Sequence, residues 1–141
     1  MITEDYVSFE IAKLLKEKGF DEYCKSAYHV GSVCSVASLG YHDNEGYGEI
    51  IDEKQNSDFG KYDNAISAPT LQMAMKWLRN IHDIVCSVGL FTDLPEMPPY
   101  WSFNILNQST ANVMYEAFDV KCETYEEAAE AAIKYCLENL I

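Results

Sequence analysis

Basic residues are scarce in this sequence, and their scarcity excludes a broad class of functions. The chain has 10 lysine and arginine residues against 23 aspartates and glutamates, which gives a formal net charge of −13 at pH 7. Arg79 is its only arginine. Proteins that bind nucleic acids rely mainly on cationic contacts with phosphates, and a chain this acidic is repelled by that backbone. We therefore expect no direct binding of nucleic acid.

Long apolar runs are missing as well. No stretch approaches the roughly 20 consecutive apolar residues that a membrane-spanning helix needs. The N-terminal residues Met1–Asp5 lack the basic and apolar regions of a signal peptide. We therefore expect a cytoplasmic protein without a membrane partner. Its five cysteines, an odd number without close pairs, are then expected to be reduced thiols.

Closely spaced metal ligands are also absent. Cys24, His29, Cys34 and His42 occur within one segment, but no two of them are two to four positions apart, as the ligands of structural zinc sites normally are. The glycine- and acid-rich segment after His42 does not follow the register of a calcium-binding loop. The sequence thus predicts no metal site and no cofactor.

The N-terminal part of the chain predicts a helix followed by a hairpin. Apolar residues recur at helical spacing from Val7 to Leu15, with Ser8 as the favoured N-cap, Thr3 as its competitor, and Gly19 at the C-terminal end. Residues 23–39 then alternate loosely around a turn at 29–32, which indicates a two-stranded hairpin. A long polar and acidic loop is expected at about 40–66, with a short edge strand at 48–52.

The second part of the chain predicts a helix, three strands and a final helix. Ser67 is the expected N-cap of the first of these helices, and five residues form its expected buried stripe: Leu71, Ala74, Met75, Leu78 and Ile81. Strand-like runs follow at 84–91, 100–106 and 113–118, and Thr124 with Glu127 forms a capping box before the last helix. We expect a single α+β domain over residues 1–141, in which the C-terminal helix packs on one three-stranded antiparallel sheet.

Two resemblances follow from these segments. The order helix, three strands, helix resembles the topology of double-stranded-RNA-binding domains, but the stretch 123–130 lacks the lysines that hold phosphates in that family. Three segments (5–20, 67–79 and 124–140) resemble small uncharacterised proteins of gut anaerobic bacteria and their phages. That second resemblance implies a bacterial or mobile-element context and carries over no functional residue.

The tyrosines and acids of the 40–66 segment remain as candidates for a binding surface. Tyrosine side chains are large and rigid with a polar tip, which suits contacts with other proteins. We therefore expect a non-enzymatic cytosolic interaction protein that contacts an unidentified protein partner through Tyr41, Asp43, Glu45, Tyr47, Glu49 and Tyr62.

Two alternatives stay open. One is an acidic mimic of nucleic acid that inhibits a DNA-binding or defence protein of the host. The other is a small-ligand binder or an enzyme, with a site around His82 and Cys86. The oligomeric state is also open, because an exposed edge strand could pair two copies.

Overall fold

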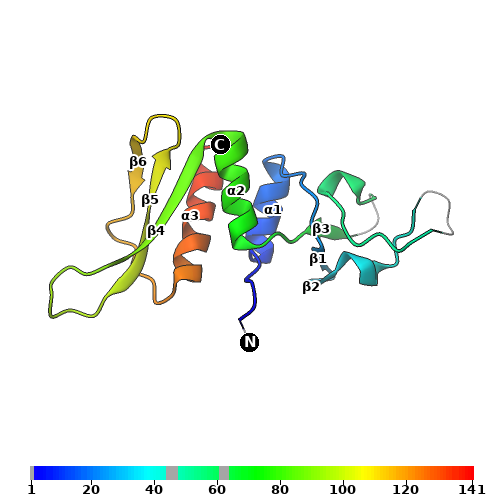
Figure 1. The fold of residues 1–141 in the computed structure, drawn as a ribbon, viewed down its shortest axis with the longest axis horizontal. Coiled ribbons are helices and arrows are strands. Elements are labelled where there is room, and N and C mark those ends of the chain that lie inside the picture. Colours follow the sequence, from blue (N-terminus) through cyan, green and yellow to red (C-terminus); the bar gives the residue numbers. More distant parts are fainter. Residues whose placement is uncertain (1, 44–47, 61–63) are drawn as a thin grey trace. The chain divides into compact units, whose positions relative to one another are not determined.

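A computed structural model shows the chain as two compact units. One unit comprises Tyr6–Thr70, and the other comprises Leu71–Ile141 together with the N-terminal residues up to Asp5. The structure describes residues 2–43, 48–60 and 64–141. These residues form three α-helices and two three-stranded antiparallel sheets (Figure 1), so the predicted α+β class is confirmed and the prediction of one sheet is wrong. The single domain over residues 1–141 stays a prediction.

The first helix, α1 (Phe9–Glu17), begins and ends where the sequence predicts. The Ser8 hydroxyl oxygen accepts a hydrogen bond from the Ile11 amide at 3.3 Å, which identifies Ser8 as the N-cap. At the other end, Gly19 has a φ of 93°, and the Phe20 amide donates to the Leu15 carbonyl at 2.8 Å. The chain thus leaves the helix through a glycine in the left-handed conformation, with Phe20 folded back.

The first sheet joins the predicted hairpin to a strand from much later in the chain. β1 (Ser26–His29) and β2 (Ser32–Ser35) form the hairpin, and β3 (Ala65–Ser67) pairs with the free edge of β1. Tyr28 lies opposite Val33 on one side and Ile66 on the other. The helix α1 packs against β3. The hairpin is therefore confirmed, but it is part of a sheet rather than a separate element.

The turn between β1 and β2 uses an unfavourable residue. Val30 and Gly31 have φ values of 51° and 83°, the signature of a type I′ turn, which needs positive φ at both central positions. Glycine adopts this conformation freely, whereas a β-branched residue such as valine is strained in it. The Val30 side chain is 80% exposed, so packing does not compensate the strain.

The long loop before β3 is fastened to the rest of its unit by one buried side chain. Asn56, at the start of the short 3₁₀ helix η2 (Asn56–Asp58), donates from Nδ2 to the Phe20 carbonyl at 2.9 Å. Its Oδ1 accepts from the Ser67 amide, also at 2.9 Å. The neighbouring Ser57 amide donates to the Asp21 carboxylate at 2.7 Å. The loop is therefore anchored both to the end of α1 and to β3.

The second helix, α2 (Leu71–His82), begins later than the sequence predicts. Ser67 does not cap it: Ser67 is buried in β3, and the chain stays extended until the Tyr6–Thr70 bridge because the Pro69 carbonyl accepts from the Val7 amide at 3.0 Å. A proline also disfavours the helical conformation in the residue before it. The prediction of Ile81 as a buried residue is wrong too, since Ile81 is 60% exposed.

The second sheet follows the sequence closely. β4 (Ile84–Phe91), β5 (Tyr100–Asn107) and β6 (Val113–Glu116) form an antiparallel meander, and both α2 and α3 (Tyr125–Asn139) pack on it (Figure 1). The Thr124 hydroxyl accepts from the Glu127 amide at 3.1 Å, as predicted. The Glu127 carboxylate reaches back one residue further than expected, to the Glu123 amide. The buried face of α3 is apolar throughout: Ala128, Ala129, Ala132, Ile133, Cys136 and Leu137.

The strained turn predicts a stabilising substitution. Val30→Asn should raise the free energy of unfolding by roughly 1 kcal/mol, because asparagine tolerates positive φ and Asn-Gly is the favoured type I′ pair. Urea unfolding followed by circular dichroism measures the change. As a control, Val33→Asn replaces the same side chain within β2, where β-branched residues are favoured, and should destabilise. A loss of stability in Val30→Asn would contradict the assigned strain.

The anchor at Asn56 predicts a large loss of stability. Asn56→Ala should lower the free energy of unfolding by roughly 3 kcal/mol, because it leaves the Phe20 carbonyl and the Ser67 amide without their partner. The matched control is Asn139→Ala, which removes an exposed side-chain bond to the Tyr135 carbonyl and should change stability by less than about 0.5 kcal/mol. Equal effects of the two substitutions would show that Asn56 is not an anchor.

Candidate functional site

The structure describes three of the six predicted contact residues and brings two of them together. Asp43 and Glu49 line one groove together. Tyr41 lies elsewhere: its ring packs against Phe59 with centroids 6.0 Å apart, and the Lys54 ammonium stands 4.1 Å from its centroid. The other three predicted residues, Glu45, Tyr47 and Tyr62, lie outside the residues that the structure describes. Two of the six predicted residues are thus shown to share a surface.

Two short antiparallel bridges build this groove. Cys24 and Lys54 exchange both backbone hydrogen bonds, at 2.9 and 3.0 Å, which brings the segment that carries Tyr23 alongside the segment that carries Glu53. A second bridge joins His42 to Ile50 and so brings Asp43 close to Glu49. The expected edge strand at 48–52 is thus reduced to a single bridged residue, because the segment finds no longer partner to pair with in the described chain.

The groove combines negative charge with apolar side chains. It has a volume of about 560 Å³, and its described lining contains four carboxylates and no basic residue. The lining residues are Tyr23, Asp43, Glu49, Ile50, Ile51, Asp52 and Glu53. Tyr23 and Ile50 are 57% and 55% exposed. The Asp43 carboxylate also accepts from the Gly48 amide at 3.1 Å, which fixes its orientation. We refer to this surface as the acidic groove.

Sequence reasoning did not select several members of the acidic groove. Asp52 and Glu53 belong to the acid-rich segment, and their adjacent charges are a signal that could have been used. Tyr23 lies about 30 positions away in the sequence, and only the Cys24–Lys54 bridge brings it to the groove. Its membership follows from tertiary structure and not from a local pattern.

At the alternative site, His82 and Cys86 contact different neighbours. The His82 ring packs edge-on against Trp77 with centroids 4.7 Å apart, and its Nε2 is buried without a hydrogen-bond partner among the described residues. The Cys86 sulfur lies 3.7 Å from the sulfur of Cys136, so its hydrogen-bond partner is a second thiol and not an imidazole. The neighbouring Asp83 carboxylate accepts from the Ser109 hydroxyl at 2.6 Å.

Three of the thiols are held in the protonated form. Burial raises the pKa of Cys24 to about 12, and burial also raises that of Cys122. The hydrogen bond with Cys86, together with burial, raises the pKa of Cys136. Since the thiolate is the reactive species, these three cysteines are poor nucleophiles and poor metal ligands. Among the described residues, no group of three or more histidine, cysteine or acidic side chains is placed to hold a metal ion.

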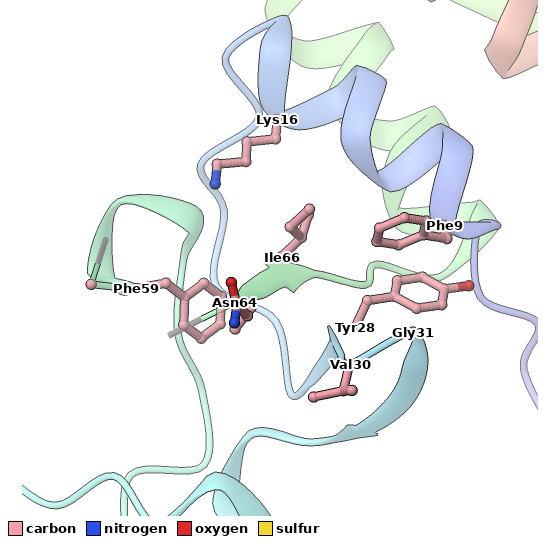
Figure 2. A pocket seen from close by; sticks show the side chains of 10 residues that line it. Phe9, Lys16, Tyr28, Val30, Gly31, Phe59, Asn64 and Ile66 are labelled. Atoms are coloured by element: carbon pink, nitrogen blue, oxygen red, sulfur yellow. The ribbon is translucent and has the colours of Figure 1, made fainter. Parts of the chain in front are cut away.

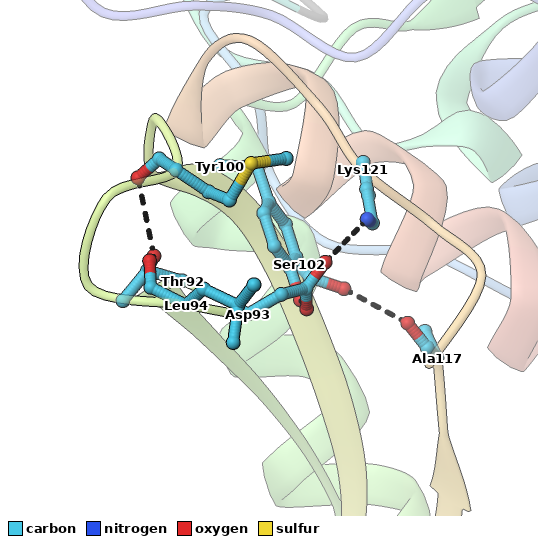
Figure 3. A network of polar contacts seen from close by, with 8 residues as sticks. Thr92, Asp93, Leu94, Tyr100, Ser102, Ala117 and Lys121 are labelled. Carbon is cyan, nitrogen blue, oxygen red and sulfur yellow. Dashed lines mark hydrogen bonds and ion pairs between the residues drawn. The ribbon is translucent and has the colours of Figure 1, made fainter.

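A polar network links two loops of the Leu71–Ile141 unit (Figure 3). The Lys121 ammonium forms an ion pair with the Asp93 carboxylate at 2.6 Å, and the Tyr100 hydroxyl donates to the other Asp93 oxygen at 2.9 Å. The Thr92 hydroxyl donates to the Leu94 carbonyl, and the Ser102 hydroxyl to that of Ala117. Each charge in this cluster already has a partner, which indicates a structural clamp on the proline-rich 92–99 connection.

Comparison of the chain with protein-family models, with curated proteins and with solved structures found no match. In the described part of the chain, no helix combines the length and the apolar character needed to cross a membrane. The assignment of a candidate site therefore depends on the geometry of the chain itself, and in that geometry the acidic groove contains two of the six predicted residues, Asp43 and Glu49.

The clamp predicts a specific dependence of stability on pH. The hydrogen bonds from Lys121 and Tyr100 lower the pKa of Asp93, so its stabilising contribution is complete above the ordinary carboxyl pKa and is lost as pH falls below about 4. The hydrogen bond with Asp93 raises the pKa of both Lys121 and Tyr100, so their contribution is lost at high pH, above about 10.

The measurement is the difference in unfolding free energy between the parent protein and Asp93→Asn, taken by urea titration at several pH values. This difference should be constant near neutral pH and shrink toward zero as pH falls from about 4 to about 2. Glu96→Gln, in the same connection, serves as the control and should show a smaller difference. A difference for Asp93→Asn that does not change with pH would rule out the ion pair as its cause.

Proposed function

We propose that this chain is a non-enzymatic interaction protein that binds a basic segment of a partner protein in the acidic groove. The observation that carries the proposal is the gathering of Asp43, Glu49, Asp52 and Glu53 around one hollow without a basic residue in its described lining. Asp43 and Glu49 are two of the residues expected from the sequence to contact a partner. The proposal therefore narrows the expected partner to one that presents lysine or arginine.

The electrostatics of the groove favour a cationic occupant. Carboxylates that lie close together add their potentials, and a chain with a net charge of −13 strengthens that potential at long range. An arginine or lysine side chain that enters the groove gains charge-assisted hydrogen bonds to the carboxylates. Each exposed contact contributes little by itself, so affinity depends on several carboxylates that act together.

The apolar members of the groove favour a protein segment over a simple cation. Tyr23 and Ile50 expose more than half of their surface, and water contact with such side chains is unfavourable. The aliphatic part of a lysine or arginine side chain can cover them while its charged end reaches a carboxylate. Tyrosine is also among the residues enriched in the energetically dominant part of protein interfaces.

The size and chemistry of the groove are compatible with the proposed binding of a cationic segment. Its volume of about 560 Å³ falls in the usual range for ligand pockets, which is roughly 300–1,000 Å³. The described lining offers carboxylates, a phenol and aliphatic groups, and it includes neither a thiol nor an imidazole. These groups can attract and orient a cationic side chain, and no pair among them forms a nucleophile with its base.

Point substitutions test the proposal better than removal of the 40–66 segment. Residues 54–66 include the Cys24–Lys54 bridge, the Asn56 anchor and part of β3, so their removal would disrupt the Tyr6–Thr70 unit. Glu49 and Asp52 are exposed, and their replacement leaves these contacts in place.

A labelled hexapeptide of alternating arginine and leucine should bind the parent protein, as measured by fluorescence anisotropy. Glu49→Lys and Asp52→Lys should each weaken binding roughly five-fold, because each replaces an attraction by a repulsion. Raising the salt concentration from about 50 to about 300 mM should also weaken it. Glu96→Lys, in the other unit, changes the net charge equally and serves as the control. An equal loss in Glu96→Lys would show that net charge, and not the groove, binds the peptide.

A further inference from the structure

A second cavity of the Tyr6–Thr70 unit differs from the acidic groove in both shape and charge. It has a volume of about 580 Å³ and is bordered by α1, the β1–β2 turn, the end of η2 and β3. Three aromatic rings line it, those of Phe9, Tyr28 and Phe59, together with the aliphatic side chain of Ile66 (Figure 2). Phe9 and Tyr28 meet edge to face with centroids 5.4 Å apart, which gives the cavity a preformed aromatic wall. We refer to it as the aromatic pocket.

The described lining of the aromatic pocket carries a charge opposite to that of the chain. Lys16 is the only charged residue in its described lining, although acids outnumber bases by 23 to 10 in the sequence. Lys13, one turn earlier on α1, stands with its ammonium 5.6 Å from the Phe9 centroid and adds a second positive charge nearby. A cationic pocket in so acidic a chain attracts anions that the rest of the surface repels.

The polar groups of the pocket lie on one side of it. Lys16 extends from α1 toward the side where Phe59 and Asn64 lie (Figure 2). The Tyr28 hydroxyl donates to the Val7 carbonyl at 2.7 Å, so Tyr28 presents mainly its ring to the pocket. A ligand would therefore meet the ammonium, the carboxamide and the Phe59 ring at one end, and the Phe9 and Tyr28 rings at the other (Figure 2).

We propose that the aromatic pocket binds a small carboxylate with an aromatic body. The ammonium of Lys16 and the amide of Asn64 can both donate to a carboxylate, and hydrogen bonds to charged groups are stronger than neutral ones. The aromatic body packs on the Phe59 and Tyr28 rings and on Ile66, where it buries apolar surface. A singly charged anion suits the pocket better than a phosphate ester, because the net charge of −13 repels each added negative charge.

This site is independent of the proposed partner surface. It shares no lining residue with the acidic groove, and a carboxylate is repelled by the four acids there. Loss of peptide binding therefore tests the acidic groove, and loss of carboxylate binding tests the aromatic pocket. Different substitutions are used for the two sites, so one proposal can fail while the other holds.

The test is a titration of the full chain with 2-naphthoate, followed by ¹⁵N NMR, with neutral 2-naphthalenemethanol as the comparison ligand. Naphthoate should shift the amide signals of Gly31, Asn64 and Ile66, with a dissociation constant below about 1 mM. The neutral alcohol should bind at least about five-fold more weakly, because it cannot form the charge-assisted bond to Lys16.

Two variants and one control complete the test. Lys16→Gln should lower the affinity for naphthoate to that for the alcohol, and Phe59→Leu should weaken both ligands. Lys76→Gln, at an exposed position of α2, removes the same charge and should change neither. The proposal is overturned if these amides do not shift at about 5 mM naphthoate. It is also overturned if the alcohol binds equally well, if Phe59→Leu has no effect, or if Lys76→Gln weakens naphthoate as much as Lys16→Gln does.

Discussion

In the Tyr6–Thr70 unit, three segments far apart in the sequence meet at the side chain of Asn56. Its carboxamide holds the Phe20 carbonyl at the end of α1 and the Ser67 amide in β3. A buried amide makes such bonds at little net gain, but it costs much free energy when a partner is lost. The positions of both candidate surfaces depend on this constraint, because the loop that carries Asn56 also contributes Phe59 to the aromatic pocket and Asp52 to the acidic groove.

The elements that the sequence predicts are those with a complete local signal. The Ser8 cap, the Gly19 end of α1 and the Thr124 cap each depend on residues within one turn of the helix. The strands of the second sheet are long or well bounded by turns. β3 lacks such a signal: it has three residues, and its partner β1 lies nearly 40 positions earlier. The sequence therefore predicts Ser67 as a helix cap, because serine often fills that role. In the structure Ser67 belongs to β3, and its amide donates to the Asn56 side chain.

The candidate surfaces likewise divide into residues that a local sequence pattern indicates and residues that only tertiary structure brings together. Composition pointed to the 40–66 segment, and Asp43 and Glu49 do share a groove. Tyr23 joins them through a backbone bridge that no local pattern indicates. The aromatic pocket was not predicted, because each of its members reads as something else in the sequence. Phe9 belongs to the first turn of a helix, Tyr28 to a hairpin strand and Lys16 to the solvated end of α1.

The chain enters and leaves the Tyr6–Thr70 unit at adjacent positions. Tyr6 and Thr70 are bridged, and just outside them the Leu71 amide donates to the Asp5 carbonyl at 3.0 Å. In the sequence, the Tyr6–Thr70 unit is thus an insertion between Asp5 and Leu71 of the other unit. These two flanking residues are hydrogen-bonded to each other. Adjacent termini are the condition under which a domain is gained or lost without disturbing its host. Both proposed binding surfaces lie in this unit, so the chain enters and leaves the segment that carries them at one bridged point.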